Sequence, residues 1–504
     1  MLTQPGSPEK RLATAVDLPP ELLLKIFQEF FDASRSQKKY PLQLRLIDFL
    51  REVGDADAAE LKELECLARI EREDRLRETD WSSEDIRSPT LFPAALARVC
   101  RTWQKALSIC DVFWTRVVIY IDDPDYLEYT RYLEYSGELH ITVAVMVRNE
   151  DAFLNSPEEE QHRTRKLIDA IAPHIPRCMT LSFEVTYTSS LPRIGTDFTL
   201  VAPQLQSLML NASIPNGLPG FMDGTELVDY IFPALKHLEI DGYNFIELRT
   251  KGRRWLSQFS ETTKSGKYHS LAVTHYRPIK DQNGQASDDF HIDLVAPLFE
   301  LFGELTLDDV RFQSFGGLIP GEFRGSPESL KLRNLSSEFT AAMVHSYSAA
   351  FLTLYRCPLS EIVSISLCTL RLVEIDYPNF SDDLARLLFE WEGGSTLTIE
   401  TCPGLDDTVL EVLGKTRKFL QATTLVSPML SELDIVNCRG FNFSTLKRVV
   451  ESRRLYITLK DIEQYFESDC FDISVVNGPV MDEEDRRWLK DYGQLGTIAH
   501  TPPT

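Results

Sequence analysis

Apolar side chains near the amino terminus recur at helical spacing. Leu22, Leu23, Ile26, Phe27 and Phe30 form one set, and a second set runs from Ala94 to Leu107. Since a helix turn takes about 3.6 residues, both sets predict short helices with one broad apolar face. Asp17, just before the first set, is a candidate N-cap.

The segment between these helices has a different character. Residues 51–80 hold 11 acidic and 6 basic side chains. Such density is typical of surface helices with intrahelical ion pairs. We interpret residues 34–88 as a charged helical insertion, and a docking helix for a partner is the alternative.

From residue 116 onward the pattern favours strands. Residues 117–121 and 139–147 are strand-like. An apolar-x-x-apolar-x-apolar frame then recurs, strongly or weakly. Its second apolar positions are Leu181, Leu208, Leu238, Leu271, Leu305, Leu330, Val373, Leu397, Leu433 and Ile457. Helices are predicted to return at Asp382–Trp391, Leu405–Phe419 and Phe443–Arg453.

Repetition of one frame predicts a solenoid, in which each unit is a strand with a returning helix. Stacked units bury a core that no single unit can bury alone. The alternative is an ordinary α/β domain with alternating strands and helices.

Charge and cysteine content narrow the class of protein. The formal net charge is −23, from 53 basic and 76 acidic side chains. This balance argues against nucleic acid and anionic membranes as partners, since both are bound through Lys and Arg. Nine cysteines without a CxxC motif fit reduced thiols. Without a signal peptide or an apolar run of about 20 residues, we expect a soluble cytoplasmic or nuclear protein.

Motifs for catalysis or metal binding are missing from the sequence: it holds no HExxH, GxxxxGK[ST] or GxSxG. His269 and His275 bracket a strand candidate but have no nearby cysteine. The acidic pairs Asp382-Asp383 and Asp406-Asp407 are interpreted as helix starts. Four glycines indicate a loop: Gly316, Gly317, Gly321 and Gly325. We expect no enzyme, cofactor or metal, and a hydrolase or transferase on an α/β fold is the remote alternative.

Two segments together resemble a known family. Leu18-Pro19-Pro20-Glu21-Leu22, with Ile26-Phe27 after it, and Val99-Cys100-Arg101-Thr102-Trp103 resemble the two halves of an F-box. Phe113-Trp114 and Tyr132–Gly137 resemble the segments that lead from the box into repeats. The halves lie farther apart than in the family, so residues 42–53 or 89–95 would supply the middle helix.

The carboxyl-terminal half resembles the leucine-rich repeats attached to F-boxes. Met429–Arg439 is one copy, and Thr398–Pro403 is a second. In both copies a cysteine follows the strand, which predicts that Cys402 and Cys438 are buried turn thiols.

The resemblance implies a substrate receptor of an SCF-type ubiquitin ligase. The box would bind a Skp-family adaptor and, through it, a cullin, while the repeats would hold a target protein. The residues expected at the adaptor are Leu18, Pro19, Leu22, Ile26, Phe27, Val99 and Trp103. The alternative is a leucine-rich-repeat interaction scaffold outside any ligase.

The predicted fold class is α/β, with a small all-α F-box-like module followed by an irregular leucine-rich-repeat solenoid. The predicted segments are a tail (1–16), the interrupted helical domain (17–115), the solenoid (116–480) and a carboxyl-terminal helix and tail (481–504). The target protein is not encoded in any motif. An arginine cluster for phosphate groups would come from Arg253-Arg254 or Arg453-Arg454.

Overall fold

The structure is a computed structural model of the chain. It describes residues 19–35, 91–149, 151–194, 196–198, 201–217, 232–251, 269–277, 301–311, 327–347, 349–391, 393–419, 422–459, 471–492 and 498–501. The predicted insertion (34–88), Leu18, the glycine cluster and Arg253-Arg254 therefore lie largely or wholly outside the described residues.

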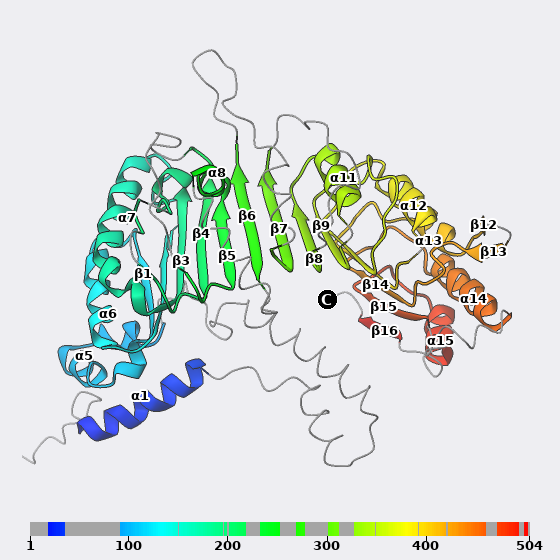
Figure 1. Cartoon of the computed structure of the whole chain (residues 1–504). Coiled ribbons are helices and arrows are strands. Elements are labelled where there is room, and N and C mark those ends of the chain that lie inside the picture. Colours follow the sequence, from blue (N-terminus) through cyan, green and yellow to red (C-terminus); the bar gives the residue numbers. More distant parts are fainter. Residues whose placement is uncertain are drawn as a thin grey trace, which may run out of the picture. The chain divides into compact units, whose positions relative to one another are not determined.

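Contacts divide the chain into two compact units. The first unit comprises Met1–Thr186, Leu200–Ser207 and Phe232–His237, and the second comprises the remaining residues. Both belong to the α/β class, since each combines parallel strands with helices (Figure 1).

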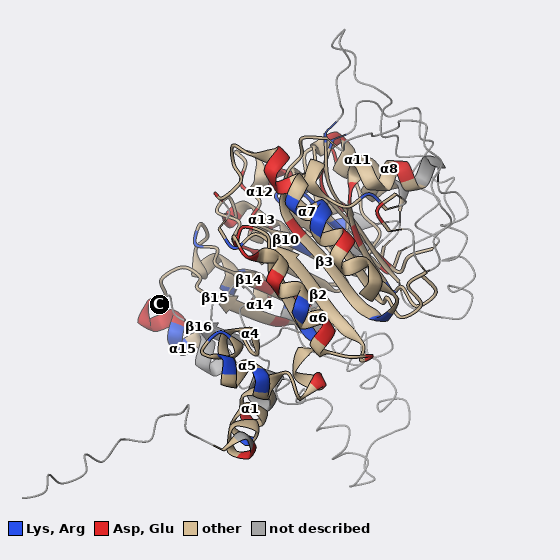
Figure 2. Ribbon diagram, turned by 90° about the vertical axis from the view of Figure 1, so that its left-hand side faces the viewer, with Lys and Arg blue, Asp and Glu red and all other residues tan. Residues whose placement is uncertain are grey.

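The first unit joins a helical module to three parallel strands. Its helices and strands are α1 (Pro20–Arg35), α4 (Ala94–Ala97), α5 (Arg101–Leu107), η2 (Asp111–Trp114), β1 (Arg116–Tyr120), η3 (Tyr126–Thr130), α6 (Arg131–Tyr135), β2 (Ile141–Met146), α7 (Pro157–Ile171), η4 (Ala172–Arg177) and β3 (Cys178–Tyr187). Helix α7 connects β2 to β3 and buries Leu167, Ile168 and Ile171. Many of its other positions carry acidic or basic side chains, as the red and blue along α7 in Figure 2 show.

The second unit is a longer series of parallel strands. Its elements are η5 (Thr188–Ser190), β4 (Ser207–Ile214), β5 (His237–Asp241), α8 (Gly242–Lys251), β6 (Ser270–Tyr276), β7 (Glu304–Val310), β8 (Ser329–Arg333), α11 (Ser337–Ser346), β9 (Phe351–Tyr355), β10 (Thr369–Val373), α12 (Phe380–Glu390), β11 (Thr396–Glu400), α13 (Asp407–Leu413), β12 (Thr416–Phe419), β13 (Ala422–Leu425), β14 (Glu432–Val436), α14 (Phe443–Leu459), β15 (Asp472–Val476), α15 (Glu483–Tyr492) and β16 (Ile498–Thr501). Strands from β6 to β16 pair in chain order, except that β12 and β13 form a separate antiparallel pair.

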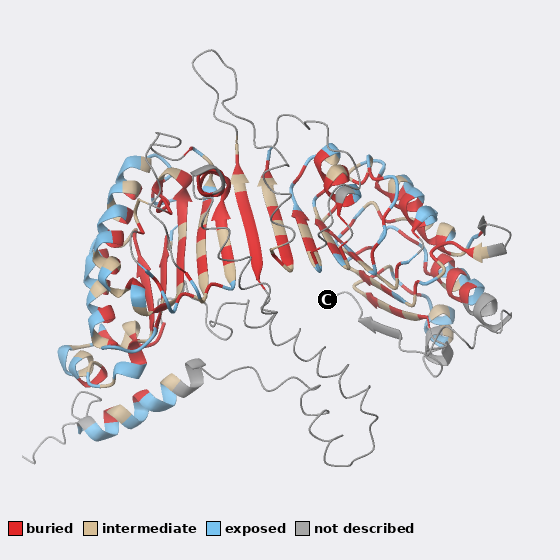
Figure 3. Ribbon diagram, viewed as in Figure 1, coloured by how far each residue is buried: buried red, intermediate tan, exposed pale blue. Residues whose placement is uncertain are grey.

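Register aligns the apolar positions from strand to strand. Leu330 pairs with Leu352, Leu352 with Leu370, and Leu370 with Leu397. These leucines are buried, whereas the alternate positions are not (Figure 3). Since strand side chains alternate between the two faces, one face is the core and the other is polar.

A left-handed turn follows the strands in the second unit. The first residue after β8, β9, β10, β11, β14 and β15 has φ between 51° and 57°: Asn334, Arg356, Glu374, Thr401, Asn437 and Asn477. The backbone N–H of Thr401 donates to the carbonyl of Val436 at 2.7 Å, and Asn437 donates likewise to Val476 at 2.8 Å. The same turn therefore recurs from strand to strand, as a repeat array requires.

Three details of the predicted frame are wrong. Strand β9 was missed because its first frame position is the small residue Ala349, which is buried but weakly apolar. At β10 the register aligns Leu370, not Val373, with Leu397. Ile457 lies in helix α14, and the strand follows it as β15.

The predicted helices are confirmed in two cases and shortened in the third. Helix α12 matches Asp382–Trp391 closely, and α14 begins at Phe443 as predicted but extends past Arg453 to Leu459. The helix predicted over Leu405–Phe419 ends at Leu413, because Thr416–Phe419 pairs with Ala422–Leu425 as a β-hairpin.

Candidate functional site

Helix α1 carries two parallel apolar stripes. Leu23, Phe27 and Phe31 lie four residues apart, and Leu22, Ile26 and Phe30 repeat the spacing one position earlier. Residues four apart share a helix face, and successive residues lie about 100° apart around the axis. The two stripes together therefore form an apolar surface too wide for a single packing contact with the rest of the module to cover.

The first stripe forms the core of the module. The ring of Phe27 packs edge-on against Trp103 of α5, with 5.3 Å between centroids. Phe31 contacts Phe113 at 5.3 Å and Phe92 at 6.1 Å. These contacts fix α1 against α5 and η2, which are far from it in sequence.

The second stripe is open. Leu22 is 47% exposed, Ile26 is 40% exposed and Phe30 is 53% exposed. Pro19 at the start of α1 is also exposed, and so is Val99 (55%) between α4 and α5. Figure 3 shows exposed and buried positions alternating along α1. We call Pro19, Leu22, Ile26, Phe30 and Val99 the open apolar face.

The predicted adaptor residues divide accordingly. Pro19, Leu22, Ile26 and Val99 are exposed, and Leu18 lies outside the described residues. Phe27 is fully buried against Trp103, so it supports the face from inside and is unavailable for direct contact. Trp103 is half-buried.

Phe30 was not among the predicted contact residues. The family pattern ends at Ile26-Phe27, so the resemblance gave no reason to include it. Its spacing of four residues from Ile26 was the available signal.

The helical module is hydrogen-bonded to the segment that follows the first strand of its unit. Arg98 donates to the Asp123 carboxylate at 3.1 Å and to the Tyr129 hydroxyl, which itself donates to Asp123 at 2.8 Å. Burial, and then the hydrogen bond to Asp123, raise the pKa of Tyr129. The indole Nε1 of Trp114 donates to the carbonyl of Leu107 at 3.0 Å. These bonds link the segment between α4 and α5 to the turn after β1 and to η3, and they link α5 to η2.

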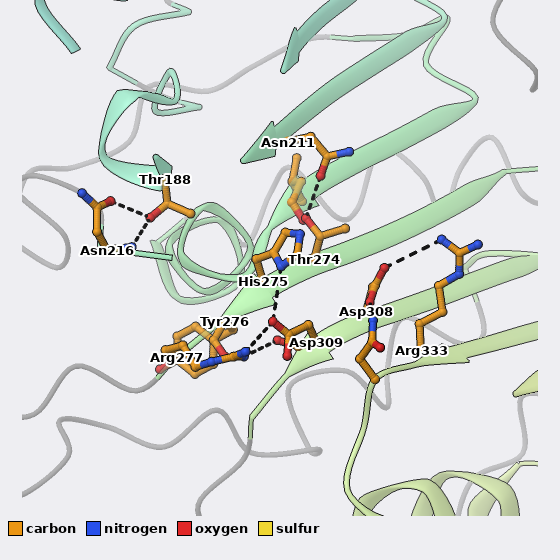
Figure 4. Close-up of polar contacts among 12 residues, drawn as sticks. Thr188, Asn211, Asn216, Thr274, His275, Tyr276, Arg277, Asp308, Asp309 and Arg333 are labelled. Carbon is orange, nitrogen blue, oxygen red and sulfur yellow. Dashed lines mark hydrogen bonds and ion pairs between the residues drawn. The ribbon is translucent and has the colours of Figure 1, made fainter. Parts of the chain in front are cut away.

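The second unit presents a different surface, the polar face of its sheet. Adjacent strands pair acidic with basic side chains: Glu304 with Lys331, Asp308 with Arg333, and Glu400 with Arg371. Figure 4 shows Arg333 pointing toward Asp308. The Asp308–Arg333 and Glu400–Arg371 pairs are partly exposed. Such pairs contribute little to stability, about 0–1 kcal/mol each, so they shape the charge of the surface more than they hold the fold. Glu304, in contrast, is buried.

The two predicted histidine candidates are separated in environment. His269 is buried, whereas His275 is half-buried with its Nδ1 3.4 Å from the Asp309 carboxylate, which also binds Arg277 (Figure 4). The positive charge of Arg277 beside that carboxylate disfavours the binding of a metal cation there. Within the described ranges, no group of three or more His, Cys, Asp or Glu side chains is arranged to hold a metal.

Buried thiols follow the left-handed turns. Cys357, Cys402 and Cys438 are fully buried. Each sulfur lies 3.4–3.8 Å from a backbone carbonyl of the paired strand one repeat earlier in the chain. Burial raises the pKa of Cys402 to about 12 and that of Cys438 to about 11. The prediction of buried turn thiols is confirmed for Cys402 and Cys438, because both side chains are fully buried directly after a left-handed turn residue. A raised pKa makes a thiol a poor nucleophile at neutral pH.

The acidic pairs start helices, as predicted. Asp406 is the N-cap of α13 and accepts a hydrogen bond from the Thr408 backbone N–H at 2.9 Å, and Asp407 follows it in the first turn. Asp382 and Asp383 lie in the first turn of α12. Carboxylates at these positions complement the partial positive charge of a helix N-terminus.

Arg453 is buried and unavailable for phosphate. Its guanidinium donates to the carbonyls of Leu413, Val426, Ser427 and Leu430 at 2.7–3.1 Å. Arg453 therefore stabilises the fold rather than forming a phosphate site.

Comparisons with known proteins do not assign a family. Neither the scan against protein-family models nor the search of curated proteins gives a match for this chain. No described helix combines the length and the apolar character needed to cross a bilayer.

Proposed function

We propose that this chain is the target-recognition subunit of an SCF-type ubiquitin ligase. In this proposal the F-box-like helices bind a Skp-family adaptor, which links the chain to a cullin. The parallel repeats, interpreted as leucine-rich repeats, hold the target protein. The chain itself makes and breaks no bond, and its contribution is to raise the effective concentration of target lysines near the conjugating enzyme.

The open apolar face carries the proposal. A module this small leaves apolar surface uncovered, and an exposed apolar stripe on a helix is a common docking surface for a partner. Figure 2 adds that α5, beside this face, carries basic side chains, which are the exposed Arg101 and Lys105. The face therefore suits a hydrophobic groove with an acidic rim.

The test is binding of the purified chain to a purified Skp-family adaptor, measured by titration calorimetry. Replacing Leu22 and Ile26 together by Ala removes two exposed side chains without opening the core. Since anchor residues at interfaces each contribute more than 1 kcal/mol, we expect affinity to fall by about tenfold or more. Val363 and Phe389, also exposed apolar residues but in the second unit, provide a matched double-alanine control with unchanged affinity.

Two results would overturn the assignment. If the folded double variant binds the adaptor as tightly as the original chain, the open apolar face is not the docking surface. If the adaptor fails to co-elute with the chain, both with and without residues 36–90, the interaction scaffold becomes the better function.

A further inference from the structure

Six residues on the polar face of the second unit form what we call the basic–aromatic strip. They come from strands β8, β9 and β10 and the turn after β9: Lys331, Arg333, Phe351, Tyr355, Arg356 and Arg371. Lys331 aligns with Thr353 and then with Arg371, and Arg333 aligns with Tyr355. The register therefore places basic side chains on both sides of an aromatic strand.

The strip is accessible. The side chains of Arg333, Arg356 and Arg371 are half exposed or more. Phe351 is also exposed, although it is aromatic and lies on a strand. An exposed aromatic side chain among arginines is the composition enriched at protein interfaces.

Tyr355 positions two of the arginines. The guanidinium carbons of Arg333 and Arg356 lie over its ring, 5.2 and 4.9 Å from the centroid. The Tyr355 hydroxyl donates to Glu374 at 2.5 Å, and Nε of Arg356 donates to the same carboxylate at 3.0 Å. These hydrogen bonds, first from Tyr355 and then from Arg356, lower the pKa of Glu374. An arginine ordered before binding loses less conformational entropy when it meets a ligand.

Acidic residues flank the strip on both sides. Glu304 and Asp308 lie on β7, and Glu400, Glu432 and Asp434 lie on β11 and β14. A continuous polyanion such as RNA would meet these carboxylates and the chain's net charge of −23. A short peptide segment with only a few spaced negative charges can place all of them over the basic–aromatic strip, away from the flanking carboxylates.

Spacing between strands sets the spacing of those charges. Neighbouring strands lie about 4.8 Å apart and residues about 3.3 Å apart along a strand. Arg333 on β8 is level with Tyr355, and Arg371 on β10 is level with Thr353. The two arginines are therefore related diagonally, roughly 10 Å across the sheet and 7 Å along it, or about 12 Å in all. An extended peptide rises about 3.3 Å per residue. Carboxylates three residues apart on an extended peptide lie about 10 Å apart, within reach of these two long side chains when the peptide crosses the strands diagonally. The residues between the carboxylates would then lie over Thr353 and Tyr355, with Phe351 beside the path of the peptide.

We propose that the basic–aromatic strip binds an extended acidic segment of the target protein, with Asp or Glu at positions i and i+3 and an apolar side chain between them. Arg333 and Arg371 bind the two carboxylates, and Phe351 contacts the apolar side chain. The inference rests on the proposed function for its biological meaning, since it names the kind of target that the receptor would take.

The experiment measures peptide binding by the purified full chain in the absence of adaptor. Fluorescent ten-residue peptides of three classes are compared by polarisation: Asp/Glu-x-x-Asp/Glu with a central Phe or Leu, the same with the acidic residues changed to Lys, and the same with the apolar residue changed to Ser. We expect the first class to bind at least tenfold more tightly than the second, with affinity falling as salt rises.

Variants locate the binding. Arg333→Glu with Arg371→Glu is expected to lower affinity for the acidic class by about tenfold or more, because repulsion replaces two charge pairs. Arg448→Glu with Arg486→Glu changes the net charge equally at two exposed helical positions and should leave affinity within about twofold of the original. Adaptor binding, measured separately, should be the same for both variants.

Three results would overturn the inference: no preference for the acidic class, equal losses in the two double variants, or equally tight binding of a single-stranded RNA oligonucleotide. None of them touches adaptor binding, so failure of this inference and failure of the proposed function are distinguishable.

Discussion

Asp241 is a fully buried acid whose pKa differs between the folded and the unfolded chain. Its carboxylate lies at the start of α8, where it accepts hydrogen bonds from the backbone N–H of Tyr243 at 2.9 Å and from the Asn244 side chain at 2.6 Å. Burial raises its pKa from 3.8 to about 6 despite these bonds. Desolvation therefore outweighs the favourable effect of the N-cap on the charged form.

This shift predicts a pH dependence of stability. Between pH 4 and 6 the folded chain retains a proton on Asp241 that the unfolded chain has lost, so this residue makes the free energy of unfolding fall as pH rises. The loss is about 3 kcal/mol, from a shift of roughly two pH units. Urea denaturation of the original chain and of Asp241→Asn at pH 4 and pH 7 isolates the effect. A difference between the two chains that is the same at both pH values would contradict it.

Arg453 shows how a buried charge can be held by backbone carbonyls without a carboxylate. Four carbonyls accept from its guanidinium, and its charge lies 4.9 Å from the centre of the Phe471 ring. Burial lowers its pKa to about 10, still far above neutral pH. The side chain thus joins α14 to the loops before β14.

Replacing Arg453 by Met should leave those carbonyls without a donor. We expect the free energy of unfolding to fall by about 3–5 kcal/mol, the range for breaking a buried charged network. Arg448→Met, on the same helix but exposed, should change it by less than about 0.5 kcal/mol. Similar urea midpoints for the two variants would show that the buried guanidinium has no special role.

At the scale of elements, the repeated turn explains much of what the sequence predicted. Strands with two buried leucines recur because each turn returns the backbone to the same register. Asn occupies the left-handed position three times, at Asn334, Asn437 and Asn477. Asn tolerates this conformation better than β-branched residues do. Thr401 at the equivalent position has φ of 54° and is therefore strained.

Thr401→Asn is accordingly expected to raise the free energy of unfolding by about 0.5–1 kcal/mol, part of the cost of a left-handed residue with a branched Cβ. The Thr401 hydroxyl already accepts from the Asn437 amide at 3.4 Å, and an Asn side chain can keep this contact beside the Asn477–Asn437 hydrogen bond of 2.8 Å. Thr398→Asn, within strand β11, should be neutral or destabilising. Equal effects of both substitutions on the denaturation midpoint would show that Thr401 is not strained.

At the scale of the whole molecule, the periodicity of apolar residues predicted most helices and strands, but it did not predict the register between strands. Strand β9 was missed because Ala349 stands at the first apolar position of its frame, and Leu370 fits the frame as either its first or its second apolar position. Sequence adjacency suggested arginine pairs such as Arg453-Arg454, whereas the exposed cluster comes from three separate segments. Exposure of Phe30 and burial of Phe27 likewise depended on which stripe of α1 meets Trp103. Strand register and side-chain burial depend on packing between segments distant in the chain, so the hydrophobic pattern of a single sequence does not specify them.

The connection between α1 and α4 offers the last prediction. Phe31 near the end of α1 and Phe92 lie 6.1 Å apart between ring centroids, so the two described segments that flank residues 36–90 are in contact close to their ends. A Gly-Ser linker of about 12 residues has an r.m.s. span near 19 Å, ample for this gap. Shortening the loop also lowers its closure entropy by about 1 kcal/mol.

We therefore expect a chain with residues 36–90 replaced by this linker to fold with α1 docked, and with a free energy of unfolding equal to or about 1 kcal/mol above that of the original chain. Protection of α1 amides in hydrogen exchange is the direct measurement, since this helix is held by its ring contacts with α5 and η2. Adding Phe27→Ala to the shortened chain should abolish that protection, because it removes a buried ring worth about 3–5 kcal/mol. Loss of protection in the shortened chain without that substitution would mean that residues 36–90 themselves hold α1 in place, and that the open apolar face depends on them.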